Sequence, residues 1–314
     1  PVAAAPAKAG VPRWGLGALA AVAVIVAIAL GSFFALRPAQ SPPTKGGSPT
    51  AGGSTPTAAA PLAVELPPAV AGSKTLRVVT NVPYTPAEFY DSQKRIVGFD
   101  VDLINAVAEE LGVTAEFQNM DFKQLIPSVQ QGNGDVVMAA LTDTKQREAV
   151  VDLVTYYSAG TLWAQRAGTA PIDPNNACGL TVAVQTTTTQ ETDDLPARSQ
   201  ACSAAGKPPI TIRSLERMDD VFNAVAGNQA DALAADSPVT AYGIKASNGA
   251  LTTAGSMYDA APYGWAVAKN SLMGPALKKA LQQVMASGRY KDILDQWGLG
   301  IGAISAPQIN GAIN

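Results

Sequence analysis

Short apolar runs alternate with amphipathic segments along most of this chain. The run at 76–80 has the β-branched content of a strand, whereas 99–111 carries apolar residues at helical spacing and stops at Gly112. We expect further strands at 113–117, 136–141, 180–184, 231–235 and 263–268, and further helices at 122–129, 218–226, 275–285 and 290–297. Strands that alternate with helices indicate βαβ units, so the pattern predicts an α/β fold with a mainly parallel sheet.

One predicted strand is followed directly by an arginine. The strand at 136–141 leads into Thr142 and Thr144, either of which can cap a helix. Arg147 lies in the first turns of that helix. Three features would then meet at one place: a strand end, the free amides of a helix start, and a guanidinium. Helix amides attract anions, and a guanidinium can bind a carboxylate with two hydrogen bonds. This predicts a binding site for a small carboxylate; the alternative is a solvated arginine that pairs with Asp143.

The beginning of the chain has a different composition. Residues 15–36 carry no charge, and a helix of this length spans a hydrocarbon core of about 30 Å. We expect an uncleaved single-pass anchor preceded by a short cytosolic stretch, 1–14; a cleaved signal peptide is the alternative. Residues 37–73 are rich in Pro, Gly, Ser, Thr and Ala, which predicts a disordered tether. In both cases we expect the rest of the chain outside the cytoplasm.

The composition excludes several classes of function. With a net charge of −3 on 314 residues, the chain has no basic excess for binding nucleic acid. It contains no His, which excludes His-based catalysis and His metal sites. The two cysteines, Cys178 and Cys202, lack the spacing of a metal site. No metal or cofactor is therefore implied, and capture of a molecule is favoured over chemistry upon it.

Seven segments, in this order, resemble the family 3 extracellular solute-binding proteins, the polar amino-acid receptors of ABC transporters. They are LRVVTNVPYTPAEF (76–89), IVGFDVDLINAVAEELG (96–112), FKQLIPSVQQGNGDVV (122–137), LTDTKQREAVVDLVTYY (141–157), GLTVAVQTTTTQE (179–191), DALAADSPVTAY (231–242) and PYGWAVA (262–268). The resemblance covers roughly 74–304. The segments around the two cysteines look like the version found in high-GC Gram-positive bacteria.

This resemblance implies a two-lobe periplasmic-binding-protein-like fold of type II. The first lobe is expected at 74–160 and 261–304, the second at 161–260, and a C-terminal tail at 305–314. Two crossover hinge strands would join the lobes, which close on an amino acid. In such an extracytoplasmic protein the two cysteines are expected to form a disulfide; two buried thiols are the alternative.

The family motif also assigns residues to the charged ends of the ligand. Arg147 and Thr142 match positions that hold the α-carboxylate. Thr188 and Thr189 match a second-lobe pair that meets the carboxylate when the lobes close. Asp236 matches the position that pairs with the α-ammonium group, and its alternative role is to cap the helix that follows it.

Other matched positions would surround the ligand. Tyr84 and Phe122 match apolar walls of the pocket, with plain core packing as the alternative. Ala140 stands where the family commonly has Ser or Gly, which leaves only a backbone carbonyl for the ligand ammonium. Gln185 and Gln190 are also expected near the pocket.

Asn81 bears on the identity of the ligand. It occupies a position where several family members have an Asp near the ligand side chain. The loss of that charge favours an uncharged polar or amide ligand over a cationic one. Glu88, Asp91 and Asp121 are other sources of negative charge, so both kinds of ligand stay open.

These features predict a tethered extracytoplasmic binding protein that captures a polar L-amino acid and presents it to a membrane permease with its ATPase. One alternative is an enzyme on the same fold, such as a dehydratase. It would need a carboxylate as its acid or base, because the chain has no His. Another alternative is a ligand-sensing domain within a membrane complex. The pair of Arg147 and Asp236, suited to a zwitterion, favours the binding protein.

Overall fold

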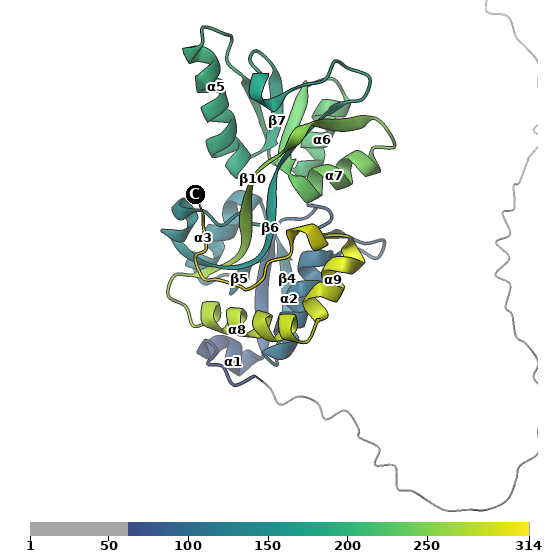
Figure 1. Cartoon of the computed structure of the whole chain (residues 1–314). Coiled ribbons are helices and arrows are strands. Elements are labelled where there is room, and N and C mark those ends of the chain that lie inside the picture. Colours follow the sequence, from purple (N-terminus) through teal and green to yellow (C-terminus); the bar gives the residue numbers. More distant parts are fainter. Residues whose placement is uncertain (1–61, 314) are drawn as a thin grey trace, which may run out of the picture. The chain divides into compact units, whose positions relative to one another are not determined.

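The structure is a computed structural model that describes residues 62–313 of the chain (Figure 1). The predicted cytosolic stretch at 1–14, the predicted anchor at 15–36 and most of the predicted tether lie outside these residues. Within residues 62–313, no helix combines the length and the apolar character needed to cross a membrane. The anchor therefore stays a prediction.

A mixed sheet of eight strands forms the centre of the fold, in the order β4-β1-β5-β10-β6-β9-β7-β8. Its six outer strands are β4 (Thr114–Asn119), β1 (Thr75–Thr80), β5 (Val136–Val137), β9 (Ala232–Asp236), β7 (Thr181–Gln185) and β8 (Thr211–Leu215). Strand β1 pairs in parallel with β4 and β5, and β7 pairs in parallel with β8 and β9. We call the half that contains β1 the first lobe and the half that contains β7 the second lobe. The prediction of an α/β fold is confirmed.

Two long strands are shared by both lobes. Strands β6 (Val151–Arg166) and β10 (Leu251–Ala268) pair with each other in antiparallel fashion and run from one lobe into the other (Figure 1). In the first lobe β10 also pairs with β5, and in the second lobe β6 also pairs with β9. Between these regions the pairing is irregular, because β10 from Ala254 to Ala261 faces a shorter stretch of β6. The strand predicted at 263–268 is only the last part of β10.

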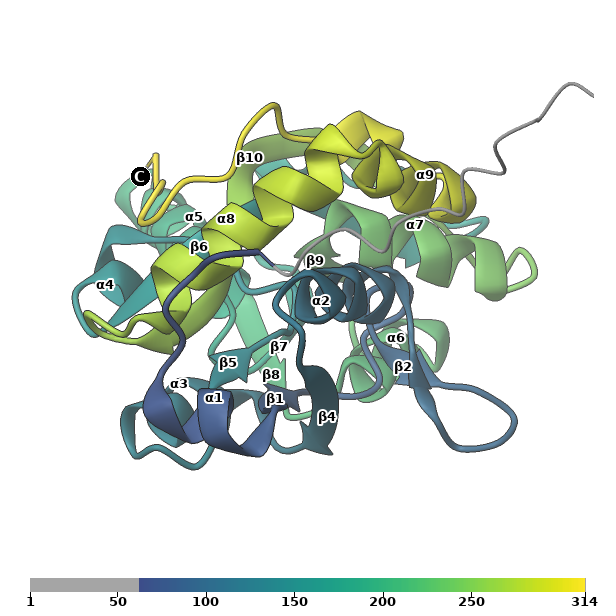
Figure 2. The ribbon, with the colours of Figure 1, turned by 90° about the horizontal axis from the view of Figure 1, so that it is seen from below.

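Helices cover the faces of the sheet. Those of the first lobe are α1 (Pro68–Ser73), α2 (Phe99–Glu110), α3 (Leu125–Gln130), α4 (Lys145–Glu148), α8 (Met273–Ala286) and α9 (Arg289–Trp297). Those of the second lobe are α5 (Leu195–Ala204), α6 (Met218–Ala226) and α7 (Ser237–Ala246). Helices α2, α8 and α9 pack against one another (Figure 2).

Smaller elements complete the fold. They are the hairpin β2 (Phe89–Tyr90) and β3 (Ile96–Val97), the 3-10 turns η1 (Phe122–Gln124), η2 (Pro174–Asn176) and η4 (Gly300–Gly302), and the π-helical turn η3 (Gln190–Asp194). The helix predicted at 122–129 is therefore η1 followed by α3. The other four predicted helices agree with the structure to within two residues at each end.

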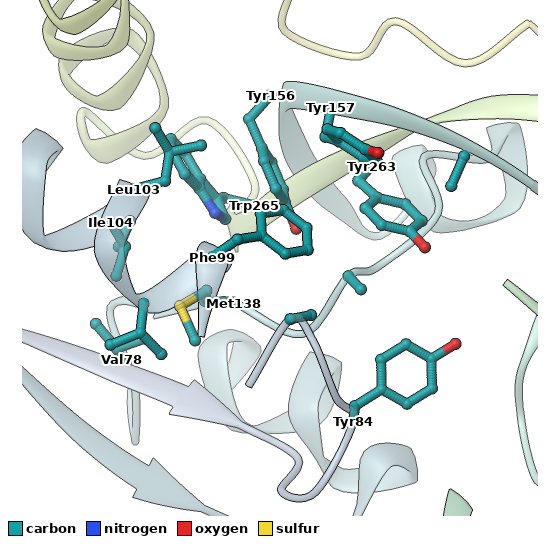
Figure 3. Packing of buried hydrophobic residues seen from close by; sticks show 14 of the residues in the cluster. Val78, Tyr84, Phe99, Leu103, Ile104, Met138, Tyr156, Tyr157, Tyr263 and Trp265 are labelled. Atoms are coloured by element: carbon teal, nitrogen blue, oxygen red, sulfur yellow. The ribbon is translucent and has the colours of Figure 1, made fainter. Parts of the chain in front are cut away.

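An aromatic cluster holds the shared strands against α2. The ring of Trp265 on β10 stacks on Tyr156 of β6, with 4.6 Å between the ring centroids. Phe99 of α2 contacts Tyr157 of β6, with 5.2 Å between the centroids (Figure 3). Full burial of a large apolar side chain contributes roughly 1.5–3 kcal/mol. This cluster therefore fixes one end of both shared strands within the first lobe.

Two carboxyl groups, of Glu88 and Asp100, are buried beside this cluster. The Asp100 Oδ2 atom accepts hydrogen bonds from the Tyr156 hydroxyl (2.6 Å) and the Ala140 amide (3.1 Å). In the described part of the chain, Asp100 Oδ1 and both carboxylate oxygens of Glu88 have no hydrogen-bond partner. Burial raises the pKa of Asp100 to about 7, and burial together with the Asp100 charge raises the pKa of Glu88 well above its ordinary value.

Two segments expected outside the lobes are packed on the first lobe. Residues 62–73, the end of the predicted tether, include α1, and Val70 of this helix is buried in the core. Residues 308–312 of the predicted tail hydrogen-bond with β6 and α4. Apolar side chains at positions such as Leu62 and Ile309 pack against the core and hold these segments in place. The first lobe thus extends beyond its predicted bounds at both ends.

Cys178 and Cys202 form a disulfide, as predicted. The bond joins the loop before β7 to helix α5, and Cys202 is buried in the second-lobe core. It closes a loop with a sequence separation of 24 residues. A cross-link of this span restricts the unfolded chain.

Loss of this cross-link should destabilise the protein. Replacing both Cys178 and Cys202 with Ala is expected to lower the free energy of unfolding by about 3–4 kcal/mol, because the unfolded chain regains the entropy of an open loop. Urea unfolding with and without a reducing agent measures the change. The reducing agent should destabilise the wild-type chain and leave the double variant unchanged; equal sensitivity of both chains would contradict the expectation.

The buried Asp100 should make stability depend on pH. The folded state holds a proton, with a pKa of about 7, that the unfolded chain releases above its ordinary, lower pKa. The contribution of Asp100 to the free energy of unfolding should therefore fall as pH rises from about 4 to about 7, and level off above. Asp100→Asn should reduce the slope of the free energy of unfolding against pH by at most about 1.4 kcal/mol per pH unit. The part of the slope that is due to Glu88 should remain.

Urea unfolding of wild type and Asp100→Asn at several pH values measures the two slopes. Leu103→Ala serves as the control, since it removes a buried side chain of the same helix without removing an ionisable group. It should lower stability equally at every pH. A slope in Asp100→Asn as steep as in wild type would mean that Asp100 is not the proton holder.

Candidate functional site

A small cavity lies where the two lobes meet. Ten residues line it: Tyr84, Phe122, Ala139, Ala140, Thr142, Arg147, Thr188, Thr189, Gln190 and Asp236. Its volume is about 10 Å³, close to the space that one water molecule requires. Side chains from both lobes thus fill the site almost completely. Eight of the ten residues predicted to contact a ligand line this one cavity.

Arg147 reaches the cavity from α4. The Thr144 hydroxyl caps this helix by accepting a hydrogen bond from the Arg147 amide (3.2 Å), so Thr144, and not Thr142, is the cap. The helix has only four residues, and one turn supplies few aligned peptide dipoles for a field at its end. The expectation that free helix amides hold the carboxylate stays a prediction. Among the residues that line the cavity, the Arg147 guanidinium supplies the positive charge.

The guanidinium of Arg147 spans both lobes. Its Nη1 donates a hydrogen bond to the Thr142 carbonyl (2.8 Å) of the first lobe, and its Nη2 donates one to the Thr187 carbonyl (3.2 Å) of the second. The Phe122 ring lies 5.9 Å away, measured from the ring centroid to the guanidinium carbon. Burial lowers the pKa of Arg147 to about 10, so the side chain stays cationic at neutral pH.

The loop before Arg147 brings backbone groups to the cavity. Strand β5 ends at Val137, four residues earlier than predicted, because the chain turns away from the sheet. Ala140 has a left-handed conformation with a φ of +46°, and Asp100 accepts its amide hydrogen bond. This turn places Ala139, Ala140 and Thr142 along the cavity wall. Ala139 was not predicted, since an alanine in an apolar run carries no chemical signal.

Asp236 supplies the opposite charge from the second lobe. It ends β9 and is 7% exposed. Its Oδ2 accepts a hydrogen bond from the Tyr84 hydroxyl (2.8 Å) of the first lobe, and its Oδ1 accepts one from Gln190 Nε2 (2.9 Å). Although Asp236 holds the N-cap position of α7, its side chain forms no capping hydrogen bond. Burial raises the pKa of Asp236, while the hydrogen bond from Tyr84 acts in the opposite direction.

The Thr-rich turn after β7 forms the second-lobe wall of the cavity. Thr187 has a φ of +60°, and its amide donates to Glu191 Oε2 (2.6 Å). The Thr188 hydroxyl donates to the Gln185 carbonyl (2.7 Å), which holds the turn in shape. Thr188 and Thr189 both line the cavity, in agreement with their predicted position.

Asn81 and Gln185 lie outside the cavity lining and bind each other across the lobes. Gln185 Nε2 donates to Asn81 Oδ1 (2.9 Å), and Asn81 Nδ2 donates to the Met120 carbonyl (2.8 Å). An ion pair between Lys123 and Glu216 (2.9 Å) forms a further contact between the lobes. A direct role of Asn81 and Gln185 in ligand contact stays a prediction. The structure gives them a role in holding the lobes together.

The site is suited to binding rather than to bond cleavage. It presents a cation, Arg147, and an anion, Asp236, from opposite lobes of one cavity. A zwitterion carries the matching pair of charges, and charge-assisted hydrogen bonds are the strong ones in a buried site. Among residues 62–313, no group of His, Cys, Asp and Glu side chains is arranged to hold a metal ion.

Comparison with known proteins agrees with this geometry. The arginine-binding protein ArgT of Corynebacterium glutamicum is 43% identical over 246 residues, which cover 78% of this chain and 81% of that protein. An ancestral arginine-binding protein bound to arginine superposes with a TM-score of 0.66 and 32% identity, covering 71% of this chain and 98% of that one. An ancestral arginine-binding protein bound to glutamine gives a TM-score of 0.66 and 30% identity, covering 72% of this chain and 98% of that one.

The family assignment follows from a match over most of the chain. Residues 76–300 match the family described as bacterial extracellular solute-binding proteins, family 3. The relative from Corynebacterium glutamicum agrees with the expected likeness to high-GC Gram-positive members. The predicted family is therefore confirmed: this chain belongs to family 3 of the bacterial extracellular solute-binding proteins.

Proposed function

We propose that this solute-binding protein captures a polar L-amino acid, with arginine as the first candidate, and delivers it to the permease and ATPase of an ABC transporter. Support comes from ArgT, a relative named for arginine, and from two structures of ancestral arginine-binding proteins, one bound to arginine and one bound to glutamine. These relatives are named as binding proteins, not as enzymes.

The observation that carries the proposal is the pair of opposite charges on opposite lobes. Arg147, with the Thr142 and Thr189 groups beside it, would bind the α-carboxylate. Asp236 would bind the α-ammonium group, which is a stronger donor than the Tyr84 hydroxyl that it would displace. Every amino acid carries these two groups, so this pair selects the class of ligand and not its side chain.

An amino acid can reach the site only if the lobes separate. The contacts to be broken include the hydrogen bond between Tyr84 and Asp236 and that between Asn81 and Gln185. Strands β6 and β10 would act as the hinge, with their irregular pairing between the lobes as the place that bends. The ligand shifts the equilibrium because it contacts both lobes only in the closed state.

A buried acid near the cavity, Glu88, would suit a cationic ligand. Asn81 does not line the cavity, so its lack of charge weighs less against arginine than the sequence suggested. Burial, Asp100 and Asp236 all raise the pKa of Glu88, which lacks a hydrogen-bond partner in the described part of the chain. A cationic ligand side chain near this group would favour its ionised form. Glu88 does not line the closed cavity either, but it is buried close to Asp236 and Tyr84, which do. We therefore assign to Glu88 the discrimination of arginine from glutamine once the lobes have opened.

The family places the protein outside the cytoplasm. We further propose that the apolar segment at 15–36 anchors it in the membrane and that the residues after it form the tether. A tether keeps the receptor close to its permease and raises its effective concentration there.

Arg147→Ala should weaken binding of arginine and of glutamine about 100-fold. The change removes charge-assisted hydrogen bonds to the α-carboxylate, worth roughly 1.5–3 kcal/mol each. Isothermal titration calorimetry measures the dissociation constants. Arg217→Ala, at an exposed arginine of the second lobe, is the matched control and should bind as wild type does. Wild-type affinity in Arg147→Ala would show that the carboxylate binds elsewhere.

Glu88→Gln should change selectivity. It should weaken arginine binding at least 10-fold more than glutamine binding, because only arginine brings a cation that the Glu88 carboxylate can compensate. The control is Glu116→Gln on the exposed edge of β4, which should leave both dissociation constants unchanged. Equal losses for the two amino acids would assign Glu88 a structural role and leave selectivity to other residues.

A further inference from the structure

Residues 308–312 form a segment that we call the strap. The strap covers the edge of β6 in the first lobe, on the side that β10 does not occupy. The Thr155 amide donates to the Gln308 carbonyl (2.9 Å), and the Gln308 amide donates to the Thr155 hydroxyl (2.8 Å). Val154 and Ile309 form an antiparallel bridge. The strap therefore acts as a short additional strand beside β6.

Asn310 turns the strap away from β6. Its amide donates to the Leu153 carbonyl (2.8 Å), and its Oδ1 accepts the Leu153 amide hydrogen bond (3.0 Å). Its Nδ2 donates to Asp152 Oδ1 (2.9 Å). Asn310 has a φ of +57°, a conformation that Asn tolerates better than most residues. The turn directs the next two amides toward α4.

These two amides donate hydrogen bonds to carboxylates at the two ends of α4. The Gly311 amide donates to Asp143 Oδ2 (2.8 Å), and the Ala312 amide donates to Glu148 Oε1 (2.8 Å). Asp143 precedes the cap of the helix, and Glu148 is its last residue. Asp143 is 2% exposed, and the side chain of Glu148 is 11% exposed. The strap thus holds the helix of Arg147 from both sides.

Helix α4 needs such support. With four residues it is a single turn, and a single turn is unstable without tertiary contacts. The strap also binds one oxygen, Oδ2, of Asp143, the carboxylate that the sequence offered as an ion-pair partner of Arg147. The other oxygen, Oδ1, is buried and has no hydrogen-bond partner within the described residues. Within the described residues, the guanidinium of Arg147 donates only to backbone carbonyls. Its charge is therefore kept for a carboxylate that comes from outside the chain.

We infer that the strap is a positioning element for ligand binding: Gly311 and Ala312 hold Asp143 and Glu148, and thereby set the place and the free charge of Arg147. This inference rests on the proposed function, because it assigns Arg147 to the ligand carboxylate. The positioning residues are far from Arg147 in sequence and do not line the cavity.

Two variants of the full chain test the strap. In the first the chain ends at Pro307, which removes the strap. In the second, Ala312→Pro removes the one amide that binds Glu148, and the preceding Gly311 tolerates the proline. Isothermal titration with L-arginine and with L-glutamine should show dissociation constants at least 10-fold higher in the truncated chain and about 5-fold higher in Ala312→Pro.

Control variants must separate a loss of protein stability from a displacement of Arg147. Val284→Ala, in the buried face of α8, should lower the melting temperature without changing either dissociation constant. Ile313→Ala, at an exposed residue beyond the strap, should change neither. In an Arg147→Ala background, Ala312→Pro should weaken binding less than 2-fold further, because the strap acts through Arg147.

The outcomes are distinguishable. If the wild-type chain binds neither amino acid, the proposed function fails and the inference falls with it. If wild type binds but both strap variants bind equally well, the strap has no positioning role while the proposed function stands. An additive loss in the Arg147→Ala background would also overturn the inference, since the strap would then act on binding by another route.

Discussion

Strand β6 connects the two opposite charges of the cavity. Arg147 lies on α4, directly before β6 begins at Val151, and Asp236 pairs in register with Thr161 of the same strand. Strand β6 therefore runs between the lobes that carry the two charges, and the two side chains meet at the cavity. The irregular pairing with β10 lies near the end of β6 that pairs with Asp236. A bend of the two shared strands there would change the separation of the charges, so lobe motion and charge geometry are coupled through β6 and β10.

The cavity keeps its two charged side chains apart. Arg147 binds carbonyl groups, and Asp236 binds the Tyr84 hydroxyl and the Gln190 amide. Burying either charge costs desolvation free energy, which neutral partners offset only in part. A zwitterion that meets both charges would offset more of this cost. The site is thus less stable than an apolar core of the same size, and this is the usual relation between stability and function at binding sites.

Sequence patterns predicted the elements that form because of interactions between residues close together in the chain. Helix α2 has apolar residues at helical spacing and a glycine stop, and the motif around Arg147 and that around Asp236 placed both residues at one cavity. Features that depend on distant backbone groups were missed. The contact of Asn310 with β6 and the partnership of Asn81 with Gln185 leave no periodicity in the sequence. The cap at Thr144 was one of two equal candidates, and only the fold decided between them.

The enclosure of the cavity by both lobes has a kinetic consequence. Because residues of both lobes surround the site, a bound ligand would leave only as fast as the lobes open. Residence time would then be set by contacts that never touch the ligand, such as the ion pair between Lys123 and Glu216 at the rim. Substitutions there can alter how quickly cargo is handed over while the chemistry of recognition at Arg147 and Asp236 stays the same.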